Sequence, residues 1–254
     1  MKVLGIIPSR YASSRFPGKA LADICGKTMV QRVYEQVKAT AGVETVMVAT
    51  DDERIVRNVE SFGGSVMLTG SNHANGTSRC LEVVEKLEKQ GRTFDVVINI
   101  QGDEPLIQPE QIGRLVALFQ DGETDIATLI HPIEGADELM NPNVVKVVTG
   151  IQKQALYFSR QAIPFVRGEK IENWPGKTAV YKHLGIYAYR TPVLKKIVLL
   201  SPGRLEQAES LEQLRWLESG FVIKAEITDY EGVGVDTPED LAKLINKICN
   251  ERHL

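Results

Sequence analysis

Three cationic side chains lie close together in the first loop that the sequence predicts. Arg10, Arg15 and Lys19 fall within the stretch IPSRYASSRFPGK, directly after a short apolar run. Positive charges at this spacing repel one another unless an anion lies between them. Two guanidinium groups and an ammonium suit the several negative charges of a triphosphate, whereas the alternative is that they are solvated surface charges. We favour an anion-binding site.

This loop does not match the two commonest phosphate-binding motifs. Ser13 stands where a P-loop NTPase would need its first glycine, and Ala20 replaces the Ser or Thr after the lysine. The dinucleotide fingerprint G-x-G-x-x-G does not fit the loop either. We therefore predict a phosphate-binding loop of another kind, built from backbone amides and from Pro8, Arg10, Ser13, Ser14, Arg15 and Lys19.

Two aspartates follow strand-like segments elsewhere in the chain. Asp103 lies in VVINIQGDEPLI, where Gly102 permits the close approach of a ligand, and Asp236 lies in GVGVDTPED, before a predicted helix. Two carboxylates are the usual minimum for seating Mg²⁺ against a nucleotide. The alternatives are local roles, in which Asp103 turns the chain and Asp236 caps the helix. Together with the cationic loop, the pair favours a magnesium site.

A weaker signal lies in the stretch SNHANGTSR. Gly76 and Thr77 predict a turn and a helix cap, whose free backbone amides can bind a hydroxyl or a phosphate. His73 has no partner that the sequence reveals, so we expect a structural or surface role for it.

The segments that must position these residues alternate between strand and helix in the first half of the chain. Short apolar runs without polar alternation predict strands at 3–7, 45–50, 65–69 and 96–100. Each is followed by a segment of helical period, such as 28–40 with Met29, Val30, Val33 and Val37 on one face. This pattern is typical of a doubly wound, mostly parallel α/β sheet covered on both faces. Ligands of such sheets bind beyond the carboxyl ends of the strands.

The pattern changes after residue 125. Strand-like runs follow one another with little helix between them, which favours antiparallel pairing. A helix is predicted from Leu205 to Leu217, then a strand at 221–227, then a final helix with Thr237 as N-cap and Pro238 as its first residue. We expect one domain over residues 1–254 with an antiparallel insertion at about 130–195.

Composition excludes several classes of function. With 43% hydrophobic and 25% charged residues and a net charge of −3, the chain is an ordinary globular protein without the positive charge that nucleic-acid binding needs. Its 3 cysteines are far apart, odd in number and without metal-like spacing, so we expect neither a disulfide framework nor a zinc site, and we expect a reducing, cytoplasmic location. We expect no targeting or membrane-spanning segment.

Six blocks of the chain resemble, in order, motifs of the 3-deoxy-manno-octulosonate cytidylyltransferases, also called CMP-Kdo synthetases. They span nearly the whole chain and read IPSRYASSRFPGKAL, NIQGDEPLI, ALYFSRQAIPF, KHLGIYAYR, LEQLRWLESG and GVDTPEDL. The resemblance implies a nucleotide-diphospho-sugar transferase-like fold in a single cytidylyltransferase domain. It implies Mg²⁺-dependent transfer of CMP from CTP to the anomeric hydroxyl of Kdo, giving CMP-Kdo and pyrophosphate for lipopolysaccharide synthesis. It also implies a homodimer formed largely through the insertion.

The resemblance assigns a role to each matching residue. Arg10 and Lys19 would hold the triphosphate, with Arg15 on the same loop, and Asp103 and Asp236 would bind Mg²⁺. The sugar-binding residues would be Gln101, Arg160, His183, Tyr187 and Glu212. In the nucleoside loop, the family pattern Gly-Thr-acidic-Arg is matched at Gly76, Thr77 and Arg79, whereas Ser78 replaces the carboxylate.

The mechanism that follows needs no side-chain nucleophile. The motifs contain no Ser/His/Asp or Cys/His arrangement, so direct in-line attack by the sugar hydroxyl on the α-phosphate is the simplest hypothesis. Two alternatives are a cytidylyltransferase for a related acidic sugar, such as 8-amino-Kdo or a sialic acid, and a non-catalytic nucleotide-binding module. A nucleotide-sugar glycosyltransferase is disfavoured because Gly102-Asp103-Glu104 does not match Asp-x-Asp.

Overall fold

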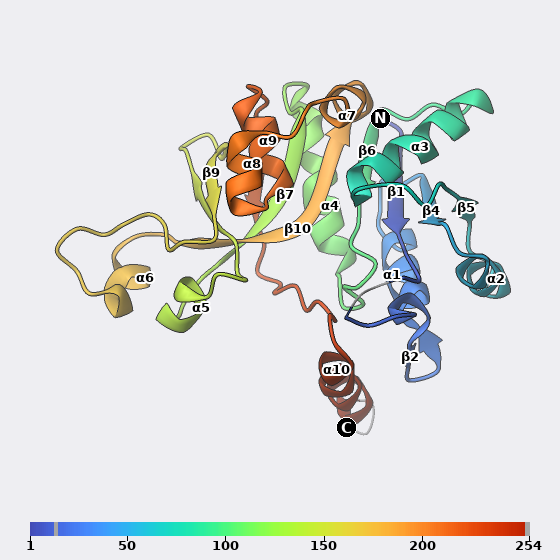
Figure 1. Cartoon of the computed structure of the whole chain (residues 1–254), viewed down its shortest axis with the longest axis horizontal. Helices are drawn as coiled ribbons and strands as arrows, with labels where there is room; N and C mark the ends of the chain where they lie inside the picture. Colours follow the sequence, from blue (N-terminus) through green and yellow to red (C-terminus); the bar gives the residue numbers. More distant parts are fainter. Residues whose placement is uncertain (13–14, 252–254) are drawn as a thin grey trace. The chain divides into compact units, whose positions relative to one another are not determined.

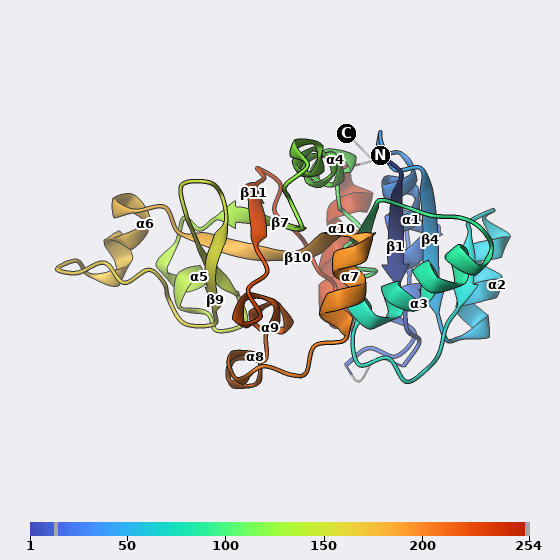
Figure 2. The same ribbon diagram turned by 90° about the horizontal axis from the view of Figure 1, so that it is seen from above.

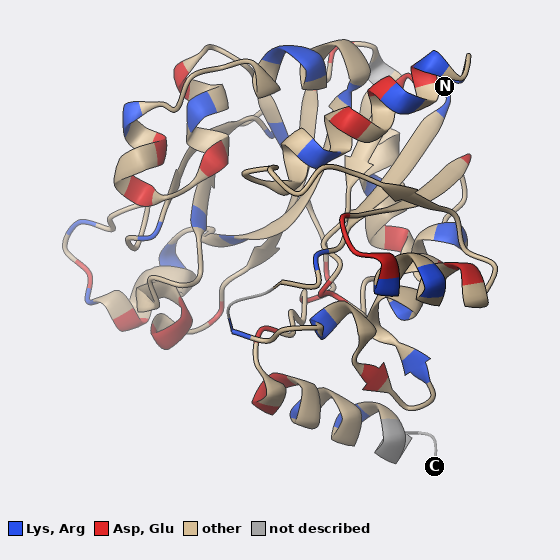
Figure 3. Ribbon diagram, turned by 45° about the vertical axis from the view of Figure 1, so that its right-hand side comes forward, with Lys and Arg blue, Asp and Glu red and all other residues tan. Residues whose placement is uncertain are grey.

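The computed structural model describes residues 1–12 and 15–251, so the predicted phosphate-loop residues Ser13 and Ser14 lie outside the described residues. The chain forms two compact units, one made of residues 1–113 and 232–254 and the other of residues 114–231 (Figure 1). Among the described residues, none of the helices combines the length and the apolar character that crossing a membrane requires. Acidic and basic residues are interspersed along the ribbon (Figure 3), in keeping with the small net charge of −3.

The first unit contains four parallel strands. In spatial order they are β6 (Val96–Asn99), β1 (Val3–Pro8), β4 (Thr45–Thr50) and β5 (Val66–Leu68). The chain runs from β1 outward to β4 and β5 and then returns to the other side of β1 to form β6. The strand order therefore reverses between β1 and β6, and the predicted parallel α/β arrangement is confirmed.

Helices cover this sheet because their apolar residues recur at helical spacing. They are α1 (Met29–Lys38), α2 (Glu53–Ser61) and α3 (Gly76–Lys89). Helix α4 (Pro109–Ala117) follows β6 in the chain, and α10 (Pro238–Glu251) packs through Leu244 against Ile24 and Met29. In α1, all four residues predicted to share a face are fully buried. Figure 2 shows α3 running beside β1 and β4. Because α1 lies on the outward path from β1 to β4 and α3 on the return path to β6, right-handed crossovers assign these two helices to opposite faces of the sheet. Short elements, η1 (Lys19–Leu21), β2 (Asp23–Ile24) and β3 (Lys27–Thr28), lead into α1.

The second unit is built around antiparallel pairs, as predicted. Strand β10 (Tyr181–Arg190) pairs antiparallel with β7 (Ile126–Pro132) and with β8 (Lys146–Thr149), which forms a hairpin with β9 (Ala155–Ser159). Strand β11 (Ile223–Ile227) adds to β7 in parallel. The remaining elements are η2 (Leu118–Asp121), α5 (Ala136–Met140), η3 (Ile171–Asn173), α6 (Trp174–Lys177), α7 (Thr191–Val198), α8 (Arg204–Glu209) and α9 (Glu212–Glu218). That residues 130–195 are a dimer-forming insertion stays a prediction.

Two details differ from the sequence analysis. The helix predicted from Leu205 to Leu217 is two helices, α8 and α9, because Ser210 adopts a left-handed conformation at φ 52° and the Arg160 side chain takes the carbonyl of Glu209 at 2.7 Å. The expectation of no disulfide is wrong for Cys25, which is disulfide-bonded, whereas Cys80 is a free, buried cysteine. Spacing along the chain does not limit which cysteines meet once the chain is folded.

Candidate active site

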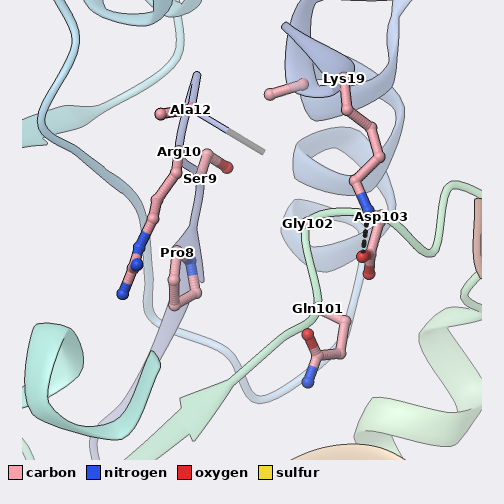
Figure 4. Close-up of a pocket in the computed structure, with 9 residues that line it drawn as sticks. Pro8, Ser9, Arg10, Ala12, Lys19, Gln101, Gly102 and Asp103 are labelled. Atoms are coloured by element: carbon pink, nitrogen blue, oxygen red, sulfur yellow. Dashed lines mark hydrogen bonds and ion pairs between the residues drawn. The ribbon is translucent and has the colours of Figure 1, made fainter. Parts of the chain in front are cut away.

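A pocket of 340 Å³ opens beside the carboxyl ends of β1 and β6, where the strand order of the first unit reverses. This is the position at which open α/β sheets bind ligands. Figure 4 shows its lining, which consists of Pro8, Ser9, Arg10, Ala12, Lys19, Ala20, Gln101, Gly102 and Asp103. The pocket thus brings together predicted site residues from two loops that are about eighty positions apart in the sequence.

The first loop folds back on itself around Tyr11. The Gly18 amide donates to the Tyr11 carbonyl at 2.8 Å, and Gly18 has a φ of 74°, which glycine adopts without strain. A Cβ at Gly18 would lie 3.2 Å from the Tyr11 ring. The Arg54 guanidinium of α2 also contacts this ring, with its Cζ 3.2 Å from the ring centroid. Because the loop folds back in this way, Lys19 lies at the start of η1 and lines the pocket.

Gly102 permits the two loops to approach each other. A Cβ at this position would lie 3.0 Å from both the Pro8 carbonyl oxygen and the Ser9 hydroxyl, which is closer than real Cβ atoms ordinarily come. The sequence analysis predicted that Gly102 allows close approach of a ligand; in the structure it allows close approach of the chain's own first loop. The consequence is that Asp103 lies opposite Lys19.

Lys19 joins the two predicted metal-binding aspartates. Its ammonium lies 2.7 Å from Asp103 Oδ2 and 3.3 Å from Asp236 Oδ1 (the Asp103 contact is dashed in Figure 4). Arg15 Nη2 lies 3.0 Å from the same Asp236 oxygen. The Lys19 side chain is only 15% exposed, so its charge is compensated by these carboxylates more than by water.

Asp236 is held in place by backbone contacts on both sides. The amide of Val235 donates to the Asp103 carbonyl at 2.9 Å, which ties the two aspartate-bearing segments together. After Asp236, Thr237 and Asp240 form a capping box at the start of α10, with the Thr237 amide donating to Asp240 at 3.0 Å and the Asp240 amide donating to Thr237 at 3.2 Å. Thr237 therefore caps the helix as predicted, which leaves the Asp236 carboxylate available for ion pairs.

The donor chemistry of this site fits a hard divalent cation. Asp103 and Asp236 offer carboxylate oxygens around a position where a positive charge, the Lys19 ammonium, already lies. Mg²⁺ is typically held by one or two carboxylates together with substrate phosphates and water. In the described part of the chain, His, Cys, Asp and Glu form no group of three or more that could hold a metal. The two aspartates are thus suited to a metal that a nucleotide brings with it.

Arg10 points away from the Lys19–Asp103 pair (Figure 4). Its side chain is exposed, and its Nη2 donates to the carbonyl of His73, in the segment that precedes α3. His73 also contacts the Glu82 carboxylate through Nε2. Burial acts to raise the pKa of Glu82, but hydrogen bonds from Lys86, His73 and the Gly70 amide outweigh it and lower this pKa to about 2. The sequence analysis missed this anchor because nothing local links residue 10 with residues 73 and 82.

The nucleoside loop begins α3, as the turn prediction implies. Asn75 is the N-cap, and its side chain accepts from the Ser78 amide at 2.9 Å. Gly76 and Thr77 form the first turn, and a Cβ on Gly76 would lie 3.1 Å from the Asn99 side chain of β6. Arg79 is fully buried, with hydrogen bonds to Thr69 at 2.5 Å and to Asp51 at 3.3 Å, so a contact of its side chain with nucleotide stays a prediction.

The other predicted sugar-binding residues belong to the second unit, whereas Gln101 lines the pocket of the first. Arg160 is fixed by backbone and carboxylate contacts: its amide donates to Glu209 at 2.8 Å, and its guanidinium donates to the carbonyls of Glu209 at 2.7 Å and Pro142 at 3.0 Å. Buried Lys146 Nζ contacts the Arg160 carbonyl at 2.5 Å. Arg160 is thus held on a rigid frame.

His183, Tyr187 and Glu212 lie near one another in this unit. The His183 and Tyr187 rings are 5.1 Å apart, and the Glu212 carboxylate contributes, after burial and Tyr189, to a Tyr187 pKa well above its usual value. Desolvation lowers the pKa of His183 to about 3, so its ring is neutral at pH 7. The Tyr187 hydroxyl is buried and has no hydrogen-bond partner among the described residues.

The tautomer of His183 follows from its neighbour. The Thr128 hydroxyl donates to the Ile186 carbonyl at 2.7 Å, so its oxygen can accept from His183 Nε2, which lies 2.9 Å away. This assignment leaves Nδ1 as an acceptor. A neutral, oriented imidazole with a free acceptor is suited to binding a hydroxyl group, which is the role predicted for His183. The Tyr187 hydroxyl is buried, so its predicted contact with the sugar stays a prediction.

Comparison with known proteins bears on the whole chain. Residues 4–227 match the family model described as cytidylyltransferase. A 3-deoxy-manno-octulosonate cytidylyltransferase of Parabacteroides distasonis is 52% identical over 98% of this chain and 99% of that protein. The enzyme of the same name from Bacteroides thetaiotaomicron is 55% identical over 95% of this chain and 96% of that protein.

Solved structures give the same picture for the fold. A CMP:2-keto-3-deoxy-manno-octonic acid synthetase complexed with CTP superimposes with a TM-score of 0.91 at 44% identity, over 99% of this chain and 100% of that one. A cytidylyltransferase from Leptospira borgpetersenii aligns with a TM-score of 0.60 at 18% identity, over 100% of this chain and 96% of that one, and shows a shared fold alone.

Proposed function

Since the chain belongs to the 3-deoxy-manno-octulosonate cytidylyltransferase family, we propose that this enzyme transfers CMP from CTP to the anomeric hydroxyl of Kdo in lipopolysaccharide synthesis. One observation carries the proposal: Lys19, Asp103 and Asp236, from three distant segments, meet at the pocket that Arg10 also lines. This combination offers cations for a triphosphate and carboxylates for a metal.

In the reaction, the anomeric oxygen forms a bond to the α-phosphorus of CTP, and the bond from that phosphorus to the oxygen of pyrophosphate breaks. The hydroxyl proton is released, and pyrophosphate leaves with the electron pair. Lys19 and Arg10 would bind the β- and γ-phosphates and so stabilise the leaving group. Mg²⁺, held by Asp103 and Asp236, would supply neutralisation of charge and increase the anionic character of the attacking hydroxyl.

Residues of the second unit would recognise the acid sugar. Arg160 suits the carboxylate because a guanidinium binds it with two parallel hydrogen bonds. The His183 Nδ1 acceptor suits a sugar hydroxyl, and Tyr187 and Glu212 are the further contacts proposed in this unit. Gln101, in the first unit, is proposed as a sugar contact on the resemblance alone. Specificity would then depend on polar groups that stay unpaired when a wrong sugar binds, and such groups discriminate strongly.

We also propose that the enzyme is cytoplasmic, since its nucleotide substrate is an intracellular metabolite. We propose further that it is a homodimer. Large apolar side chains are exposed between residues 130 and 195: Met140 at 59%, Ile151 at 104%, Leu156 at 57% and Phe165 at 75%. Exposed apolar surface of this kind supports a partner surface. Sedimentation equilibrium of the purified protein tests the dimer, and a monomer at micromolar concentration would contradict it.

The function is tested by pyrophosphate release from CTP with a panel of acidic sugars. We expect release only when Mg²⁺ and an eight-carbon 3-deoxy-2-ulosonic acid are both present, with Kdo preferred over 8-amino-Kdo and with no release for a sialic acid. A preference for one of the latter would change the acceptor but keep the reaction. No release with any sugar, from protein that binds CTP, would leave only a nucleotide-binding module.

A further inference from the structure

The segment between β5 and α3 connects the first loop with the nucleoside loop. Residues 69–75 have no regular secondary structure; the Thr69 amide donates to the Thr50 carbonyl at 2.7 Å, and side-chain contacts hold the residues that follow. The segment ends at Asn75, the N-cap of α3, and it includes His73, whose carbonyl accepts from Arg10. Its conformation therefore sets both the start of the nucleoside loop and the position of the Arg10 guanidinium.

The carboxylate of Glu82 is the point to which this segment is fastened. Glu82 lies on α3, one helical turn after Ser78. It accepts from the Gly70 amide at 2.9 Å and contacts the His73 ring through Nε2, so it grips the segment at two places. Lys86, one turn further along α3, lies 2.7 Å from the other Glu82 oxygen and also donates to the Leu68 carbonyl at 2.8 Å, which fixes the carboxylate from behind.

His73 contacts two further residues besides Glu82, namely Arg10 and Ser78. Its ring Nδ1 lies 3.3 Å from the hydroxyl of Ser78, in the nucleoside loop, while its backbone carbonyl accepts from Arg10. Ser78 stands where the family pattern has a carboxylate, and the hydroxyl that replaces it reaches Glu82 only through His73. The contact with Ser78 is long, whereas those of His73 with Glu82 and with Arg10 are short, so we expect the anchoring to act chiefly on Arg10.

We propose that Glu82 is a positioning residue for nucleotide binding, which acts through His73 to hold Arg10 in place for the triphosphate. The inference rests on the proposed function, in which Arg10 binds the β- and γ-phosphates. Charge-assisted hydrogen bonds to a carboxylate are the strong ones in proteins, so neutralising Glu82 loosens the segment even though the side chain keeps its shape.

The test is a double-mutant cycle on CTP affinity, measured by calorimetry with CMP as the comparison ligand. We expect Glu82→Gln to raise the dissociation constant of CTP at least tenfold and to change that of CMP much less. In an Arg10→Ala background, Glu82→Gln adds no further loss. Glu85→Gln, an exposed carboxylate on the same helix, is the matched control and binds CTP like wild type.

Three results would overturn the inference while leaving the proposed function intact. One is an unchanged CTP affinity in Glu82→Gln, another is an equal loss for CMP and CTP, and the third is a full additional loss in the Arg10→Ala background. If Glu82→Gln does not fold, His73→Ala replaces it in the same cycle with the same expectations. Wild-type protein that fails to bind CTP refutes the proposed function itself.

Discussion

Replacing Lys19 with methionine should make the two aspartates better metal ligands in the absence of nucleotide. In the structure the Lys19 ammonium forms ion pairs with both carboxylates, at 2.7 Å from Asp103 and 3.3 Å from Asp236. A divalent cation must displace it to bind there, whereas a bound triphosphate would attract the ammonium and free the carboxylates. On the proposed function Lys19 would couple metal affinity to nucleotide binding, and such coupling is reciprocal.

The size of this effect follows from the exposure of the groups. A charge pair at 2.7 Å has a gross attraction of about 6 kcal/mol at an effective dielectric constant of about 20. Most of it is cancelled by hydration, because the side chains of Lys19, Asp103 and Asp236 are 15%, 30% and 47% exposed. Ion pairs of this exposure contribute up to about 1 kcal/mol each. The two pairs together therefore weaken metal binding by ~1–2 kcal/mol, which is roughly 5- to 30-fold in the dissociation constant.

The assay is a titration with Mn²⁺, followed by the paramagnetic resonance signal of the free ion. Lys19→Met should bind Mn²⁺ alone roughly 5- to 30-fold more tightly than wild type, and added CTP should then enhance metal binding less than it does in wild type. Lys27→Met removes the same charge from an exposed pair with Glu35 in the same unit and controls for net charge. If Lys19→Met binds Mn²⁺ alone no more tightly than Lys27→Met, the ammonium does not compete with the metal and the reasoning is refuted.

Three further predictions concern other parts of the molecule. Asp103→Asn should lower turnover at saturating CTP at least a hundredfold, a barrier increase of about 3 kcal/mol, and wild-type turnover in a pyrophosphate assay would remove Asp103 from the metal site. Gly102→Ala should lower kcat/KM at least tenfold by pushing Pro8 and Ser9 away from residue 102, while Gly113→Ala, whose Cβ would meet nothing within 4 Å, should stay near wild type; equal activities would show that the loops tolerate separation. The His183 pKa of about 3 lies below the ordinary 6.5, so the unfolded chain takes up the proton first and the free energy of unfolding falls as pH drops from about 6.5 towards 3. Denaturant titrations of wild type should show a loss of up to ~1 kcal/mol per pH unit that His183→Gln lacks. Equal losses in wild type and His183→Gln would contradict this prediction.

The sequence predicted the parts of the site that depend on local patterns. Apolar runs locate β1 and β6, and the residues after them, Arg10, Lys19, Gln101 and Asp103, line one pocket because parallel strands end at the same edge of a sheet. The periodic face of α1 and the Thr237 cap of α10 are local as well, and both were predicted correctly. The assigned roles of the site residues stay predictions.

The sequence could not predict contacts that depend on which loops meet. His73 was expected to have no special partner, yet it contacts both Arg10 and Glu82. Ser210 breaks a helix whose periodicity continues through it, because Arg160, fifty positions away, takes the Glu209 carbonyl. In both cases a charged side chain that looks like surface charge in the sequence is fixed by a partner from a distant segment.

The cationic loop raises the question of how three positive charges coexist before a nucleotide arrives. Lys19 and Arg15 are paired with the aspartates that would later hold the metal, while Arg10 is directed to a backbone carbonyl and stays exposed. The site therefore neutralises part of its own charge and leaves one guanidinium exposed, which in the proposed function would attract the first phosphate. Each paired cation would then move to the nucleotide as a carboxylate is released to the metal, so that the charges of metal and triphosphate would enter the pocket together. Such an exchange would need cations and carboxylates on different segments, because groups on one rigid loop could not separate.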